Sequence, residues 1–163
     1  MLILEEFLMT RIRIVVLAVL AVVLFDAGVA FAAQPPSNVM APVRTLLAVT
    51  DGRSNVNLDT LFTPDGVVID ESAPYLWSGP HAGSQWWAHV RGMFVAMHMR
   101  GFNAAAGPPI EYSQTGARAY LILPMTLSGT GLKPFHEKGT LTFTFRRIVA
   151  DWKISSEVWT TAL

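Results

Sequence analysis

Residues 84–99 read SQWWAHVRGMFVAMHM, and this stretch, together with the strands that follow it, decides the fold. Apolar side chains recur in it at spacings of three and four, which places them on one face of a helix. That face carries Trp86, Val90, Met93, Phe94 and Met97. The pattern predicts a long amphipathic helix that packs one face against a second layer of structure.

Beyond Gly101 the spacing of the apolar residues changes from that of a helix to that of a strand. Over residues 138–147, Leu141, Phe143 and Phe145 alternate with a row of threonines. A period of two is typical of a strand with one buried face. The second layer is therefore expected to be a sheet.

Further strands are expected over residues 110–112, 118–127 and 152–161. Pro124 interrupts the middle one, and its missing N–H favours a bulge or a sheet edge at that point. The glycine-rich stretch at 128–131 is expected to close a hairpin.

Two more helices and a strand are expected upstream. Apolar spacing predicts a helix over 39–50 and a short one over 58–62, capped by Asn57. A turn at 63–66 then precedes a β-branched strand over 67–71, and the segment after it either pairs with that strand or continues it. Helices first and antiparallel strands afterwards indicate an α+β domain, with the helices on one face of a curved antiparallel sheet.

The composition narrows the class of protein. The 163 residues include 12 Lys+Arg, 12 Asp+Glu, no cysteine and 52% hydrophobic residues. This length favours one domain with a substantial core. The lack of cysteine excludes disulfides, thiolate-bound zinc, iron–sulfur clusters and a cysteine nucleophile. Zero net charge without a basic cluster argues against a nucleic-acid partner.

The N-terminal segment has the pattern of an export signal. The uncharged apolar run IVVLAVLAVVLF at 14–25 follows Arg11 and Arg13, and the small-residue motif at 30–32 comes after it. The run is shorter than the roughly 20 residues that span a bilayer. It therefore favours a cleaved signal peptide over an uncleaved anchor.

This pattern predicts a signal peptide at 1–32, a linker at 33–38 and one domain at 39–163. The mature protein is expected in the periplasm or the extracellular space, without stable membrane association. Two acidic residues near the start are unusual in a signal peptide, so translation is expected to begin at Met9.

Five short pieces carry a resemblance to a known family. They are VIDE at 68–71, PYLWSGP at 74–80, WW at 86–87, GTLTF at 139–143 and DWKI at 151–154. Their order resembles that of SnoaL-like and ketosteroid-isomerase-like proteins of the nuclear transport factor 2-like superfamily, over about residues 39–162.

The resemblance implies a cystatin-like α+β barrel, in which a cone-shaped, curved antiparallel sheet wraps a long helix. The mouth of the cone opens into an apolar pocket, and many members pair as homodimers through the sheet. The superfamily contains isomerases, dehydratases and cyclases as well as binding proteins, so the fold alone does not select a function.

Asp70 is the strongest candidate for chemistry, because an acidic residue in a β-branched strand requires an explanation. Strand alternation places it on the same face as Val68. If that face lines the pocket, Asp70 can serve as a general base. The alternative is a capping role or an ion pair with an arginine such as Arg118.

Aromatic residues complete the expected pocket. Tyr75 and Tyr120 are candidate catalytic hydrogen-bond donors to a developing oxyanion, or else ordinary core aromatics. The expected pocket-lining residues are Trp77, Trp86, Val90, Phe94, Phe143 and Val158. No cofactor and no metal site are expected, because the histidines have no second ligand at a suitable spacing.

The last strand is expected to present an uncharged face to the pocket. Counting by twos from Ile154 places Ser156 and Val158 in the pocket, and it places Glu157 and Trp159 toward solvent or a partner subunit. Such a row offers neither histidine nor carboxylate, which argues against acid–base chemistry.

These observations favour an exported protein that binds a small hydrophobic or aromatic molecule without robust catalysis. The alternative is a cofactor-independent isomerase, dehydratase or cyclase with Asp70 as general base. A third possibility is an interaction domain that uses its sheet for dimerisation. The position of Asp70 relative to the pocket discriminates between the first two.

Overall fold

The structure is a computed structural model that describes residues 34–162. The expected signal peptide at 1–32 lies outside the described residues. The described residues form one compact unit. Among the described residues, no helix has the length and apolar character needed to cross a membrane.

Helices and strands follow one another in the expected α+β order. The helical elements are α2 (Ser37–Thr50), the 3-10 helix η1 (Leu58–Leu61) and α3 (Ala82–Ala96). The strands are β1 (Phe62–Ile69), β2 (Leu76–Ser78), β3 (Arg100–Ala106), β4 (Glu111–Thr115), β5 (Arg118–Thr130), β6 (Phe135–Ile148) and β7 (Asp151–Thr161).

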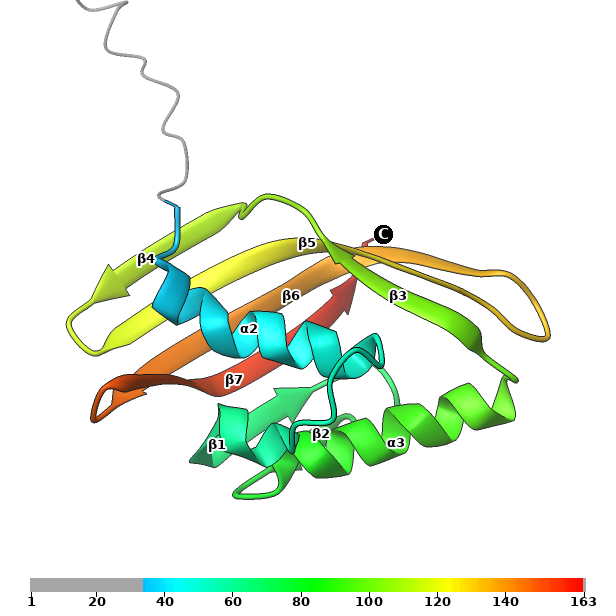
Figure 1. Cartoon of the computed structure of the whole chain (residues 1–163), viewed down its shortest axis with the longest axis horizontal. Coiled ribbons are helices and arrows are strands. Elements are labelled where there is room, and N and C mark those ends of the chain that lie inside the picture. The colour runs from blue at the N-terminus through cyan, green and yellow to red at the C-terminus, as the bar shows by residue number, and fades with distance from the viewer. Residues whose placement is uncertain (1–33, 163) are drawn as a thin grey trace, which may run out of the picture. The chain divides into compact units, whose positions relative to one another are not determined.

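The strands form one curved, open sheet in the order β2-β1-β7-β6-β5-β3, and β4 also pairs with β5. Its pairs are antiparallel except that β1 runs parallel to β7, so the expectation of a wholly antiparallel sheet is corrected at this junction. Figure 1 shows α2 lying across the sheet and α3 beside β1 and β2. Helix α2 packs on β7 and β3, and α3 packs on β1 and β2.

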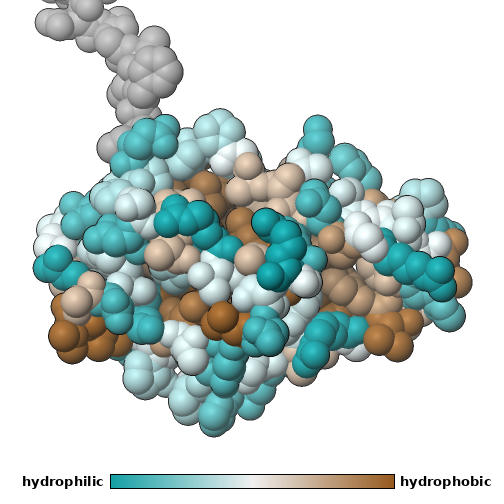
Figure 2. Space-filling model, viewed as in Figure 1, coloured by the Kyte–Doolittle hydropathy of each residue, from teal (hydrophilic) through white to brown (hydrophobic). Residues whose placement is uncertain are grey.

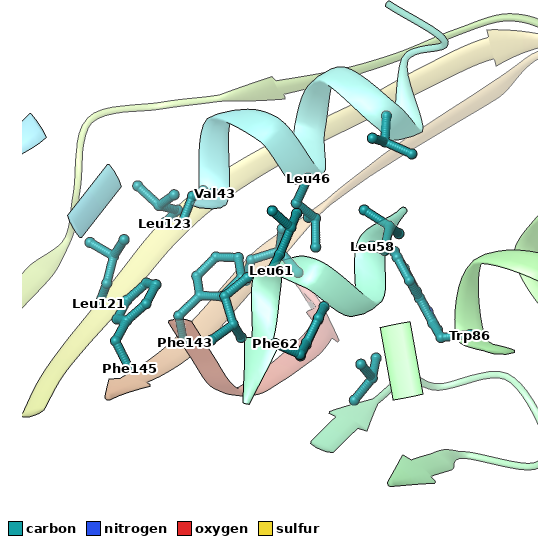
Figure 3. Close-up of a cluster of buried hydrophobic side chains, with 14 of the residues drawn as sticks. Val43, Leu46, Leu58, Leu61, Phe62, Trp86, Leu121, Leu123, Phe143 and Phe145 are labelled. Atoms are coloured by element: carbon teal, nitrogen blue, oxygen red, sulfur yellow. The ribbon is translucent and has the colours of Figure 1, made fainter. Parts of the chain in front are cut away.

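The core lies between α2 and the inner face of the sheet (Figure 3). Val43 and Leu46 of α2 pack there with Phe143 and Phe145 of β6, all of them buried. The threonines that alternate with these phenylalanines on β6 are half-buried. Period-two alternation over β6 therefore predicted the buried face correctly.

Several boundaries differ from the expected ones. Residues 63–66, expected as a turn, belong to β1, and a register shift between Phe62 and Val67 accommodates them as an irregularity of the strand. The hairpin between β5 and β6 closes later than expected, with residues 131–134 as its loop. Strand β3 was not predicted because its sequence, RGFNAAA, contains no β-branched residue.

Pro124 interrupts neither β5 nor its pairing with β6, where it stands opposite Thr140. It lies where the other neighbour of β5 changes, because β4 pairs up to Ile122 and β3 begins to pair at Met125. On this side of β5, Pro124 therefore falls between the end of one partner strand and the start of the next. This is the local sheet edge that was expected at the proline.

Candidate functional site

A cavity of about 350 Å³ lies between α3, the end of α2 and the inner face of the sheet. Helix α3 contributes Trp86, Trp87, Val90, Met93, Phe94 and, just after its end, Met97. The sheet side includes Phe102, Met125, Leu127, Phe135 and Leu141. In the view of Figure 2, apolar surface is visible between α3 and β3, bordered by hydrophilic residues. The cavity is thus apolar over most of its wall.

The helix face predicted from residues 84–99 is the face that lines this cavity. Trp86 and Val90 are each 8% exposed and anchor α3 against the core, whereas Met93 and Phe94 are half-buried because the cavity lies beside them. A tilted contact joins Phe94 to Phe102 across the cavity, with 4.5 Å between ring centroids. The aromatic wall therefore continues from the helix to the sheet.

Asp70 follows β1 directly and lines the cavity. Its Oδ2 accepts a hydrogen bond of 2.9 Å from Nε1 of Trp86. Its Oδ1 accepts hydrogen bonds from the backbone N and from Oγ of Ser72, at 2.9 and 2.7 Å. Asp70 therefore lies in the cavity wall, and it also caps the backbone at Ser72, as one of the alternatives expected.

The ion-pair alternative for Asp70 is wrong. Within residues 34–162, Asp51 and Asp65 are the carboxylates that form ion pairs with arginines. Arg118 is exposed at the start of β5.

Glu157 is a second carboxyl group of the cavity, and the sequence prediction placed it on the wrong face. β7 carries a bulge, because Thr144 pairs with Ser156 while Phe145 pairs with Ile154, which leaves Ser155 as an extra residue. One extra residue inverts the alternation that follows it. Glu157 and Trp159 consequently line the cavity, and Val158 lies in register with Thr142 on the outer face.

The side chain of Glu157 is buried, and one of its carboxyl oxygens receives no hydrogen bond from the described residues. The residue is 1% exposed, and the oxygen in question is Oε2. Desolvation, and in second place the negative charge of Asp70, raise the pKa of Glu157 to about 8. At neutral pH the group therefore carries its proton and can donate a hydrogen bond into the cavity.

Two further carboxylates stand at the rim of the cavity. Glu71 is exposed and Glu137 is half-buried. Thr161 joins them, because its backbone N donates to Oε1 of Glu71 at 2.7 Å and its Oγ1 lies 2.5 Å from carboxylate oxygens of both residues.

Both tyrosines that were candidate donors lie outside the cavity wall. Tyr75 is 59% exposed in the connection between β1 and β2 and has a φ of 72°. Tyr120 pairs with Thr144 on the outer face of the sheet. The structure therefore brings Asp70 into the cavity without either phenol, and Nε1 of Trp86 is the ring donor that contacts it.

The six expected lining residues divide into two sets of three. Trp86, Val90 and Phe94 line the cavity. Trp77 and Phe143 are buried in the core instead, and Val158 is on the outer face for the reason given above.

Asp59, His81 and Ser84 form a cluster at the start of α3 that has the composition of a hydrolytic triad. His81 Nδ1 and Ser84 Oγ both contact Oδ2 of Asp59, at 3.0 and 2.9 Å. The backbone N of Ser84 also donates to Asp59 at 2.8 Å. Because serine and histidine share the carboxylate rather than each other, the cluster is a cap for α3 and provides no activated nucleophile.

Comparison with known proteins gives matches among solved structures alone. No family model matches the chain, and no curated protein matches it. The structure of LinA superposes with a TM-score of 0.66 at 14% identity, covering 78% of this chain and 85% of that one. A scytalone dehydratase-like protein from Novosphingobium aromaticivorans gives 0.62 at 13% identity, with coverages of 78% and 83%.

A third similar structure is a nuclear transport factor 2-like superfamily protein from Salmonella enterica. It superposes with a TM-score of 0.62 at 15% identity, over 78% of this chain and 90% of that one. Another similar structure is described as having a cystatin-like fold. At these identities the similarity concerns the fold, which agrees with the open α+β sheet seen here. The chain has the nuclear transport factor 2-like, SnoaL-like fold.

Proposed function

We propose that this protein binds a small, largely apolar molecule in the cavity between α3 and the sheet. The observation that carries the proposal is the cavity itself, about 350 Å³ in volume, with an apolar wall and two carboxyl groups, Asp70 and Glu157. Concave apolar sites with a few convergent polar groups are the usual form of a small-molecule site. The wall buries an apolar ligand, and the carboxyl groups orient its polar end.

A substitution that fills the cavity tests this proposal. Ala104 of β3 is 8% exposed and lines the cavity, whereas its neighbour Ala105 is exposed. Ala104→Leu should lower the affinity for a hydrophobic fluorescent probe at least about tenfold, equivalent to about 1.4 kcal/mol, by occupying the space of the ligand. Titrations of wild type and variant monitored by fluorescence give the ratio.

Ala105→Leu is the matched control, because it adds the same side chain to the adjacent residue outside the cavity wall. Its affinity for the probe should stay within about twofold of wild type. Equal affinities for Ala104→Leu and wild type would place the binding site elsewhere and refute the proposal.

A second candidate function, proton transfer, is favoured by the presence of two unlike carboxyl groups in one cavity. Glu157 holds its proton at neutral pH, as a result of desolvation first and of Asp70 second. Asp70 accepts hydrogen bonds from Ser72 and Trp86 and is oriented by them. A base and a proton donor beside one ligand are the requirement for cofactor-independent isomerisation or elimination. The similar structures include hexachlorocyclohexane dehydrochlorinases and a scytalone dehydratase-like protein.

Replacing Asp70, the proposed base, distinguishes ligand binding from proton-transfer catalysis. Asp70→Asn keeps the shape of the side chain but removes its ability to accept a proton. If the protein is an enzyme, the variant should lose at least about a hundredfold in turnover of a substrate and keep its affinity within about tenfold. Turnover that persists unchanged in Asp70→Asn would exclude Asp70 as the base.

We also propose that the protein is exported and forms homodimers. Support for export comes from the apolar run at 14–25 and the small-residue motif at 30–32. Native and denaturing mass spectrometry of the periplasmic fraction should show a chain that begins at Ala33 and a complex of twice that mass. A full-length cytoplasmic product would refute export, and a purely monomeric spectrum would refute the dimer.

A further inference from the structure

The titratable side chains of the cavity are all acidic. Asp70 and Glu157 line its interior, and Glu71 and Glu137 stand at its rim. The lining residues contributed by α2, α3, β3 and β5 include no titratable group, and within the described part of the chain no lysine, arginine or histidine belongs to the wall. A ligand in this cavity thus meets up to four negative charges and no positive one.

One of these groups lacks the partner that burial normally requires. Oε2 of Glu157 is buried and has no hydrogen-bond partner in the described part of the chain, whereas three donors satisfy Asp70. A buried carboxyl oxygen without a partner loses the free energy of its hydration. Because Glu157 is one of the residues that line the cavity, a ligand bound there lies next to this carboxyl group and can offset the cost of its burial.

Three indole rings line the same cavity as these carboxyl groups. Trp86, whose indole N–H contacts Asp70, lies beside Trp87 with 6.0 Å between the ring centroids. Trp159 enters the cavity from β7, two residues after Glu157. Indole faces attract cations, and the attraction grows when water is excluded. Carboxylates and indole rings together form an environment suited to a positive charge.

We propose that the ligand is a small hydrophobic ammonium ion, whose charged end lies between Asp70, Glu157 and the indole rings. This inference rests on the proposed binding function and adds to it the chemical class of the ligand. The apolar wall between α3 and β3 accommodates the hydrocarbon part, and the acidic end accommodates the charge.

The charge of the ligand is coupled to the ionisation of Glu157. A cation between the two carboxyl groups offsets their repulsion, so the bound complex favours an ionised Glu157. Without ligand this group keeps its proton up to a pKa of about 8, set by desolvation and then by Asp70. Binding of a permanent cation must therefore displace the proton, and the affinity should rise with pH until the free protein has lost it.

Two probes of the same shape test the inference, benzyltrimethylammonium and its neutral isostere neopentylbenzene. Neither titrates, so any effect of pH on affinity comes from the protein. At pH 8.5 the cation should bind wild type at least about tenfold more tightly than the isostere. Between pH 6 and pH 8.5 its affinity should rise severalfold, whereas that of the isostere should stay constant. Calorimetric or fluorescence-competition titrations give both numbers.

Glu157→Gln separates the charge from the shape of the cavity. The variant should lose at least about fivefold in affinity for the cation at pH 8.5 and lose the pH dependence, while the isostere binds within about twofold of wild type. Glu111→Gln, on the exposed strand β4 and outside the cavity wall, is the control and should change neither affinity.

The outcomes distinguish this inference from the proposed function. Equal affinities for the two probes at every pH would overturn the cationic ligand and leave hydrophobic binding intact. Binding of neither probe to wild type would count against both. If Glu157→Gln does not fold, the wild type alone tests the cationic ligand. An affinity for benzyltrimethylammonium that does not rise between pH 6 and pH 8.5 would then overturn it.

Discussion

Phe143→Ala should destabilise the folded protein by about 3–5 kcal/mol, the range found when a fully buried phenylalanine is truncated. Phe143 is 0% exposed and lies at the centre of the inner sheet face, stacked on Phe145 with 5.7 Å between the ring centroids. Strands β5 and β7 flank it on both sides, so the surrounding backbone cannot collapse into the space left behind. Urea unfolding at constant pH measures the loss.

Thr142→Ala provides the control on the same strand. Thr142 is half-buried on the outer face, opposite Val158. Its truncation should cost less than about 1 kcal/mol, the scale of strand propensities. A Phe143→Ala variant that is no less stable than Thr142→Ala would show that the assignment of inner and outer faces is reversed.

The free energy of unfolding should fall by about 5 kcal/mol between pH 4.5 and pH 8 on account of Glu157 alone. In the unfolded chain this carboxyl ionises near its ordinary pKa of 4.5, whereas desolvation, aided by Asp70, raises the pKa to about 8 in the folded protein. Between these values the folded state binds one proton more, so a rise in pH favours unfolding at about 1.4 kcal/mol per pH unit. The contribution is complete below pH 4.5 and lost above pH 8.

Comparison with Glu157→Gln isolates this contribution from all other titrating groups. The amide keeps the shape and cannot ionise, so the stability of the variant relative to wild type should increase steadily from pH 4.5 to pH 8. Thr142→Ala, which removes no titratable group, should show no such trend. The difference in unfolding free energy between Glu157→Gln and wild type is the quantity to follow. If it changes by less than about 1 kcal/mol from pH 4.5 to pH 8, Glu157 ionises normally.

Local patterns were sufficient to predict the layers of the fold. The apolar face of α3 and the alternation on β6 identified which side chains meet between helix and sheet, because both patterns depend on the period of a single element. Strand β3 was not predicted, because Asn103 and three alanines give no apolar alternation. The segment is a strand because it pairs with β5, which its own sequence does not indicate.

The candidate site was predicted only in part, and one residue accounts for the misplacement of Glu157 and Val158. The extra Ser155 in β7 inverts the alternation, so that counting from Ile154 placed Glu157 on the wrong face. The sequence does contain a signal of this inversion. Trp159 is a large apolar residue out of phase with Trp152 and Ile154, as expected if a bulge lies between them.

Asp70 was identified because an acidic residue stood out in a β-branched strand, and its partner Trp86 came from the helix prediction. The contact between them spans 16 residues and could not be inferred from either pattern. The same limit applies to Tyr75 and Tyr120, because their exclusion from the cavity depends on the β1–β2 connection and on the register of β5.

The five tryptophans of the chain offer a direct test of ligand binding in the cavity. Trp86, Trp87 and Trp159 line it, whereas Trp77 and Trp152 are buried in the core away from it. The measurement is the indole N–H region of a ¹⁵N NMR spectrum during titration with benzyltrimethylammonium and neopentylbenzene. Saturable shifts of the three cavity signals, with the Trp77 and Trp152 signals unmoved, are the predicted result. If both probes leave the cavity signals unmoved, or shift all five alike, the cavity is not the binding site.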